Sequence, residues 1–226
     1  MFAFLDAHRD VTVCFVDDGS ADGTLAVLQA LRGERPDRIL VHALSPNVGK
    51  AAAVRAGVRH VAAAGAWGVI GYWDADLSAP LTEVDRLLQV LKGDPQCQLA
   101  MGSRVKLLGS KIERRAARHV LGRVFATAAS WLLGFPVYDS QCGAKLFRRD
   151  IVEVLFGEPF LTRWLFDLEM LARLRNRHRA VTLDCAREVP LSTWTEVGGS
   201  KLRLREMIRV PIELLKIRWR YNLTTP

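Results

Sequence analysis

The stretch AWGVIGYWDADLS, residues 66–78, places an apolar run directly before two carboxylates. The run has the composition of a buried β-strand, and Asp74 and Asp76 follow at its end. Because side chains of an extended segment alternate between faces, both carboxylates should point the same way and share one divalent cation. Mg²⁺ or Mn²⁺ is often held by one or two carboxylates together with substrate phosphates. The pair therefore suggests chemistry on a nucleotide diphosphate, against the simpler alternative of a turn or helix cap.

Size and composition fit a single large domain. The 226 residues are 50% hydrophobic, which is enough for a sizeable core. The chain carries no apolar run of membrane-spanning length and no secretory leader pattern. The four cysteines are widely separated and form no Cys-x-x-Cys pair, which favours reduced thiols in a cytoplasmic compartment over a zinc site or a disulfide framework.

The chain is basic, with 32 Lys plus Arg against 24 Asp plus Glu and a net charge of +8. Such a charge favours an anionic partner, which is a nucleotide, an acidic membrane surface or a nucleic acid. No helix-turn-helix, zinc-finger or aromatic RNA-binding signature is legible, so we expect no nucleic-acid partner.

Short apolar runs alternate with helical patterns through the first hundred residues, as in a parallel sheet with crossover helices. Strands are expected at residues 11–16, 38–43, 67–73 and 98–101, and helices at 23–31, 49–64 and 81–91. Beyond these we expect a basic helix over 111–133, a strand near 144–147, a helix over 164–175 and a strand over 180–184. The fold class is α/β, in which ligands bind at the carboxyl ends of strands.

Two loops after expected strands carry polar residues that fit a ligand site. Asp17 and Asp18 end the first strand, where they are placed to bind a base or ribose, and two adjacent carboxylates exceed what a helix cap requires. Asn47 and Lys50 belong to SPNVGKA, which opens a helix whose amides favour anions. A P-loop is excluded, because its first glycine is replaced by Leu44 and its Ser/Thr by alanine.

The segment KIERRAARH, residues 111–119, places several cations in the early turns of the expected basic helix. Cations at a helix N-terminus oppose the helix dipole, so a bound anion would explain them. The alternative is a solvated basic face. In the second half, Asp139 and Asp167 supply further carboxylates; Asp167 and Glu169 are two residues apart on a helix and should not act as a pair.

From residue 200 onward the pattern is a basic amphipathic helix with Trp219 and Tyr221 near its end. Pro211 should kink or divide this helix. Such a segment suits a membrane interface, and the alternative is a helix packed on the domain's own core. The expected organisation is therefore a catalytic domain over residues 1–199 and C-terminal helices over 200–226.

Seven motifs in order, taken together, resemble a known family. They are VDDGS at 16–20, NVGK at 47–50, DAD at 74–76, GSR at 102–104, QCGAKLF at 141–147, FDLE at 166–169 and GSK at 199–201. This set resembles the inverting family 2 glycosyltransferases of the GT-A fold, and within them the dolichyl- or polyprenyl-phosphate glucosyl- and mannosyltransferases. The resemblance runs through nearly the whole chain and implies a Rossmann-like, mostly parallel sheet with flanking helices.

The resemblance implies a role for each group of residues. The residues expected to bind the nucleotide sugar are Asp17, Asp18, Asn47, Lys50 and Asp74. The expected ligands of a Mg²⁺ or Mn²⁺ ion are Asp74, Asp76 and Ser78. The residues expected to bind the acceptor phosphate are Arg114, Arg115, Arg118, Ser200 and Lys201, and the expected catalytic residues are Asp76, Asp139, Asp167 and Arg104. The donor would be UDP-glucose or GDP-mannose, the acceptor polyprenyl or dolichyl phosphate, and the location the inner face of an anionic membrane.

Because a phosphate acceptor is largely ionised at neutral pH, it needs little help from a base. If the acceptor were a saccharide hydroxyl instead, Asp167 or Asp139 would be the base. Members of this family normally begin with one more strand and a nucleotide-cradling turn, so we expect the first, central strand to be missing here. That absence keeps open a third alternative, a catalytically silent module that binds nucleotide sugar or membrane.

Overall fold

The computed structural model describes residues 1–113, 116–178, 184–197 and 204–223. The strands are β1 Val13–Asp17, β2 Ile39–Ala43, β3 Val69–Trp73, β4 Leu99–Ser103, β5 Lys111–Glu113, β6 Ala144–Arg148, β7 Ala186–Pro190 and β8 Thr193–Thr195. The helices are α1 Phe2–Ala7, α2 Thr24–Glu34, α3 Lys50–Ala64, α4 Glu83–Gly93, α5 Ala116–Leu133, α6 Val152–Phe156, α7 Phe166–His178 and α8 Leu204–Arg220, with a 3-10 turn at Arg149–Ile151. The alternation of strand and helix over the first hundred residues is as expected.

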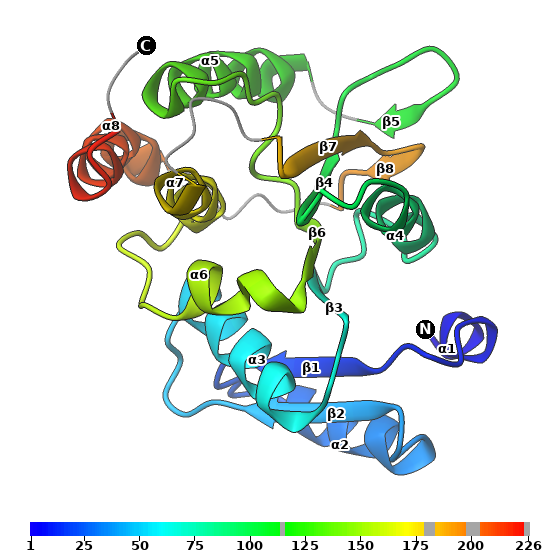
Figure 1. Cartoon of the computed structure of the whole chain (residues 1–226). Coiled ribbons are helices and arrows are strands. Elements are labelled where there is room, and N and C mark those ends of the chain that lie inside the picture. Colours follow the sequence, from blue (N-terminus) through cyan, green and yellow to red (C-terminus); the bar gives the residue numbers. More distant parts are fainter. Residues whose placement is uncertain (114–115, 179–183, 198–203, 224–226) are drawn as a thin grey trace.

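The described strands form three sheets (Figure 1). β1 and β2 pair in parallel, with Asp17 opposite Ala43. The main sheet has the order β3-β6-β4-β7, in which β6 is antiparallel to both neighbours and β7 is parallel to β4. A small parallel pair, β5 and β8, completes the set. The sheet is therefore mixed in its second half, because β6 enters it from the opposite direction.

Within the part of the chain that the structure describes, no backbone hydrogen bonds join the β1–β2 pair to the main sheet. Among the described strands, β1 pairs with β2 alone and β3 with β6 alone, so each presents an unpaired edge. Helix α3 packs on both β1 and β3 and bridges the interruption. In Figure 1 the β1–β2 pair lies apart from β3 at the bottom of the view.

Helices cover both faces of the main sheet. The larger apolar core joins β3, β4 and β6 to helices α3, α5, α6, α7 and α8. A second core lies between the sheet and α4. Helix α7 is buried on all sides from Phe166 to Arg175, although it carries four charged residues there. Those charges therefore need partners inside the protein, and they shape the site described below.

One expected element was wrong, one falls largely outside the described residues, and one forms a continuous helix where a kink or division was expected. Residues 111–113 form strand β5 rather than a helix, because Ile112 is buried against Trp194 of β8 while its two neighbours are exposed. The strand expected over 180–184 falls largely outside the described residues, and the strand beside β4 is β7. Helix α8 continues through Pro211 without division, since Leu214 and Ile217 pack it into the core.

Candidate active site

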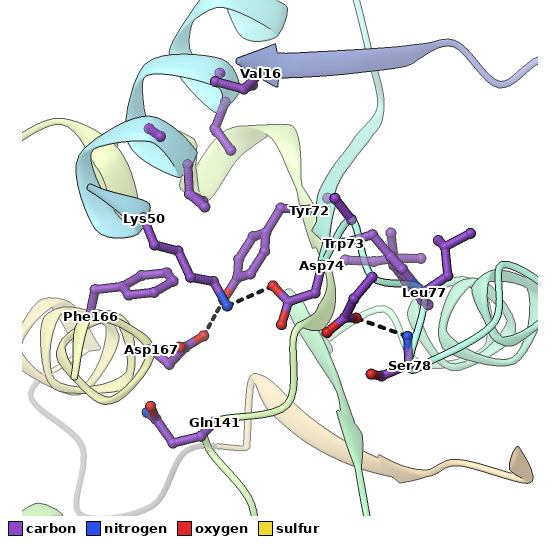
Figure 2. A pocket seen from close by; sticks show the side chains of 18 of the residues that line it. Val16, Lys50, Tyr72, Trp73, Asp74, Leu77, Ser78, Gln141, Phe166 and Asp167 are labelled. Carbon is purple, nitrogen blue, oxygen red and sulfur yellow. Dashed lines mark hydrogen bonds and ion pairs between the residues drawn. The ribbon is translucent and has the colours of Figure 1, made fainter. Parts of the chain in front are cut away.

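One cavity of about 2380 Å³ runs through the protein and is lined by many of its elements. At one end it is lined by the end of β1, the start of α3, the end of β3, the loop before β6 and the start of α7. Figure 2 shows Lys50, Tyr72, Asp74 and Asp167 directed toward one another in this cavity. The same cavity extends between the unpaired edges of β1 and β3. The carboxyl-end position expected for a ligand site is thus observed.

Asp17 and Asp18 both order the loops at the first sheet. The buried Asp17 carboxylate accepts a hydrogen bond from the hydroxyl of Ser20. The two oxygens of Asp18 accept from the backbone N–H groups of Val48 and Gly49, at 2.8 and 2.9 Å, and Asn47 donates to the Asp18 carbonyl at 2.6 Å. Asp18 therefore satisfies amides at the start of α3 and fixes the position of the next residue, Lys50.

Lys50 projects from the first turn of α3 toward Asp74. Its Nζ lies 2.6 Å from Oδ1 of Asp74. The carboxylate occupies the space beside Gly143 that a side chain would fill, so an added Cβ there would overlap both of its oxygens. The Asp74 N–H also donates to the Gly143 carbonyl at 2.8 Å. Glycine at position 143 is thus required for this orientation of Asp74.

Asp76 and Ser78 lie in a turn rather than in an extended strand. β3 ends at Trp73, and the Leu77 N–H donates to the Asp74 carbonyl, with Leu77 at a positive φ of 52°. Asp76 Oδ1 accepts from the Ser78 N–H at 2.9 Å. The reasoning from strand alternation was therefore wrong, although both carboxylates line the same cavity.

The carboxylates suit a hard divalent cation that completes its coordination with substrate oxygens. The described residues contain no cluster of three or more His, Cys, Asp or Glu able to enclose a metal ion. Asp74 already attracts a cation, the Lys50 ammonium, and Gly143 leaves room for its carboxylate. Few protein ligands and open oxygens are the pattern of magnesium bound through a diphosphate.

A buried network lies behind the cavity. The Lys145 ammonium is 2.6 Å from Asp167 Oδ1 and donates to the Cys142 carbonyl at 2.6 Å. The Tyr72 hydroxyl donates to the same Asp167 oxygen. Burial, followed by the charge and hydrogen bond of Asp167, raises the pKa of Tyr72 well above its usual value. One oxygen of Asp167 is therefore bound by both an ammonium and a phenol.

Arg104 and Asp139 form a second ion pair beside the cavity. The guanidinium donates to both carboxylate oxygens at 2.7 Å, and the Arg104 N–H adds a third bond at 2.9 Å. Burial lowers the pKa of Arg104, but the hydrogen bonding and the charge of Asp139, together with weaker contributions from Cys142 and Asp167, raise it above its usual value. The Glu188 carboxylate of β7 accepts hydrogen bonds from the backbone N–H groups of Tyr138 and Asp139, which fixes the loop between α5 and β6.

The expected acceptor-phosphate residues are mostly beyond what the structure describes. Arg114, Arg115, Ser200 and Lys201 lie outside the described residues, and Arg118 lies in α5 with its side chain outside them. Lys111 lies in β5. From the same helix, Arg123 lines the cavity with its guanidinium 4.1 Å from the Tyr138 ring centroid. A cation of the basic helix therefore does reach the cavity.

The family model for glycosyl transferase family 2 matches residues 3–156, more than half of the chain. The chain belongs to glycosyl transferase family 2. A dolichyl-phosphate beta-glucosyltransferase of Trichomonas vaginalis is 32% identical over 209 residues, which cover 91% of this chain and 59% of that protein. A polyprenol monophosphomannose synthase of Mycolicibacterium smegmatis is 31% identical over 198 residues, covering 87% of this chain and 72% of that protein.

This family 2 chain also shares its fold with solved structures. Glucosyl-3-phosphoglycerate synthase of Mycobacterium tuberculosis, crystallised with Mn²⁺, UDP and glucosyl-3-phosphoglycerate, matches with a TM-score of 0.63 at 18% identity, over 95% of this chain and 70% of that one. The fold is thus GT-A, as the motifs implied. The chain spans about three fifths of the length of several dolichyl-phosphate relatives that it matches.

Four residues of this family 2 site were not singled out from the sequence. They are Tyr72, Gly143, Lys145 and Arg163. Lys145 carried a signal, because a lysine in the apolar segment CGAKLF must be buried with a partner. Arg163, whose guanidinium packs beside Gly49 at the start of α3 and lines the cavity, carried none. Its position depends on how the loop before α7 folds over α3.

Proposed function

We propose that this protein transfers a hexose, with glucose as first choice, from a nucleotide sugar to a polyprenyl or dolichyl phosphate. The names of its relatives support the acceptor class, and the neighbour crystallised with Mn²⁺ and UDP-glucose supports a nucleotide-sugar donor and a divalent cation. UDP-glucose and GDP-mannose are the donors to test. The transfer inverts the anomeric carbon in a single displacement.

Asp74, Asp76 and Ser78 would hold Mg²⁺ or Mn²⁺, which would neutralise charge on the departing diphosphate. Lys50 and Arg163 line the same cavity and bring two cations to the start of α3. Asp17 and Asn47 also line the cavity, and they would bind the nucleoside. The chain's own contribution is to bind, orient and neutralise the donor, which suits a reaction driven by positioning and charge.

Both carboxylates that could act as a base are already bound by other side chains, and this observation favours a phosphate over a hydroxyl acceptor. Asp167 is bound by Lys145 and Tyr72, and Asp139 by Arg104. A carboxylate whose oxygens are already bound by a partner inside the protein must break that contact before it can reach a substrate hydroxyl. A saccharide hydroxyl needs a base, whereas a phosphate, with a second pKa near 6, is already an ionised nucleophile. The site therefore favours a phosphate acceptor.

A lipid acceptor also requires access to a membrane surface, and helices α5 and α8 offer one. Trp131 of α5 is 60% exposed and Trp219 of α8 is 73% exposed. Ile212 and Leu215 share the exposed side of α8 with Trp219, and Lys216 and Arg220 are exposed beside them. Aromatic and apolar side chains next to cations fit an anionic membrane interface. Within the described part of the chain, no helix is both long and apolar enough to span a bilayer.

The test is transfer of labelled glucose from UDP-glucose, or mannose from GDP-mannose, to a short polyprenyl phosphate in the presence of Mn²⁺. We expect transfer to the phosphate, no transfer to free polyprenol or to a saccharide, and loss of activity in Asp74→Asn. Transfer to the saccharide alone would assign the hydroxyl-acceptor function instead.

The interrupted sheet favours a second candidate, a silent binding module, because β1 and β3 are not joined beside the nucleotide side of the cavity. Calorimetry with UDP-glucose separates the two functions. A module binds the nucleotide sugar without releasing UDP, whereas the enzyme releases UDP when polyprenyl phosphate is added.

A further inference from the structure

Two lysine–aspartate pairs of equal length lie at this site, and they differ in burial. Lys145 and Asp167 are 2.6 Å apart with side chains 0% and 5% exposed. Lys50 and Asp74 are also 2.6 Å apart, but their side chains are 41% and 35% exposed. A buried pair cannot part without leaving an uncompensated charge, whereas a half-exposed pair exchanges partners at little cost. The Lys50–Asp74 pair is thus the exchangeable one.

The Asp74 carboxylate is held between Gly143 and Lys50. The Asp74 N–H donates to the Gly143 carbonyl, and the carboxylate occupies the space that a side chain at position 143 would fill. Its Oδ1 carries the Lys50 ammonium, and both residues line the cavity. A cation that binds Asp74 through Oδ1 therefore has to displace Lys50.

We propose that Lys50 is a built-in counter-cation, which neutralises Asp74 in the empty site and moves to the donor diphosphate when a divalent cation takes its place. This inference rests on the proposed metal site at Asp74. Lys50 can leave Asp74 because its side chain is 41% exposed, and in its observed position Nζ also lies 5.9 Å from the centroid of the Phe166 ring, so Asp74 is not its only neighbour. The exchange keeps Asp74 neutralised throughout, so the open site does not hold divalent cations tightly without a nucleotide.

This exchange is tested by titrating the full chain with Mn²⁺ in the absence of nucleotide. Electron paramagnetic resonance measures the free Mn²⁺ at each step. We expect Lys50→Gln to bind Mn²⁺ about threefold to tenfold more tightly than the natural protein, because a competing and repelling cation is removed. Lys50→Arg should stay within about twofold of the natural protein, since it keeps the cation. Lys92→Gln, which removes a charge from another wall of the same cavity, is the matched control and should also stay within about twofold.

The second half of the exchange is tested with UDP at saturating Mn²⁺. Lys50→Gln should then weaken UDP binding about threefold to tenfold, so that the substitution strengthens one ligand and weakens the other. Loss of fold alone would weaken both, and Lys50→Met provides a second neutral variant. The proposal fails if both neutral variants bind Mn²⁺ no more tightly than the natural protein. Because neither sugar nor acceptor is present, this result is independent of whether polyprenyl phosphate is the acceptor.

Discussion

Asp167 Oδ1 receives two bonds inside the protein, one from the Lys145 ammonium at 2.6 Å and one from the Tyr72 hydroxyl. This arrangement joins β6, β3 and α7 through a single oxygen. It places a full charge pair at the base of the site, where solvent does not reach it. Stability and site geometry therefore depend on the same three side chains.

Lys145→Met should destabilise the protein by about 3–5 kcal/mol, because it leaves the Asp167 carboxylate buried without its cation. Urea unfolding measures this as a lower midpoint at an unchanged slope. The double variant Lys145→Met/Asp167→Asn should recover part of the loss, since no net charge remains buried. A single-variant loss below about 1 kcal/mol would contradict the structure.

Gly143→Ala should weaken Mn²⁺ binding about tenfold or more, because the new Cβ overlaps the Asp74 carboxylate and turns it from the cavity. Titration calorimetry with Mn²⁺ and UDP measures the effect. The matched control is Gly33→Ala in α2, where an added Cβ meets no atom within 4 Å. Equal Mn²⁺ affinities in the two variants would show that Asp74 does not hold the cation.

Trp219→Ala should lower partitioning onto vesicles rich in phosphatidylglycerol about threefold to tenfold, since it removes a large aromatic side chain from the exposed side of α8. Flotation at low salt measures the bound fraction. Val27→Ala on α2 is the control, because Val27 is an exposed apolar residue, at 60%, that lies on a different helix. If both variants partition alike, the membrane contact lies elsewhere.

Stability should fall as pH rises above 10, in part through Tyr221. Burial, followed by the charge and hydrogen bond of Glu169, raises the pKa of Tyr221 to about 12. The unfolded phenol titrates near 10, so between about pH 10 and 12 the unfolded state loses its proton first. This contribution to stability is complete below pH 10 and is lost as pH approaches 12. Between pH 9 and 12 the free energy of unfolding should fall less steeply with pH in Tyr221→Phe than in the natural protein. Equal slopes in the two proteins would refute the assignment to Tyr221.

Much of the fold was legible because hydrophobic periodicity and turn residues are local signals. β1, β2, β3 and α3 begin and end within about two residues of the expected positions. β5 was not legible, because three residues with one buried side chain carry little pattern and depend on pairing with β8. The direction of β6 also escaped prediction, since strand direction is set by the tertiary path of the chain.

The sequence predicted which residues belong to the candidate site but not which of them contact one another. The sequence indicated Asp74 and Lys50 separately, and their pairing depends on how α3 approaches the end of β3. Asp18 was expected to contact a nucleotide, and its observed bonds go to the backbone at the start of α3. Gly143 escaped notice because a glycine that makes room for a carboxylate leaves no chemical signature in the sequence.

The interruption between β1 and β3 has a thermodynamic consequence. Asp17 ends β1 and Asp74 follows β3, so a ligand that contacts both would tie together parts that share α3 but no strand pairing. Its binding free energy would add to the stability of the joined form by RT ln(1 + [L]/Kd). If the proposed nucleotide sugar binds in this way, it strengthens the sheet that holds it, and a rise in unfolding temperature measures how much of it is bound.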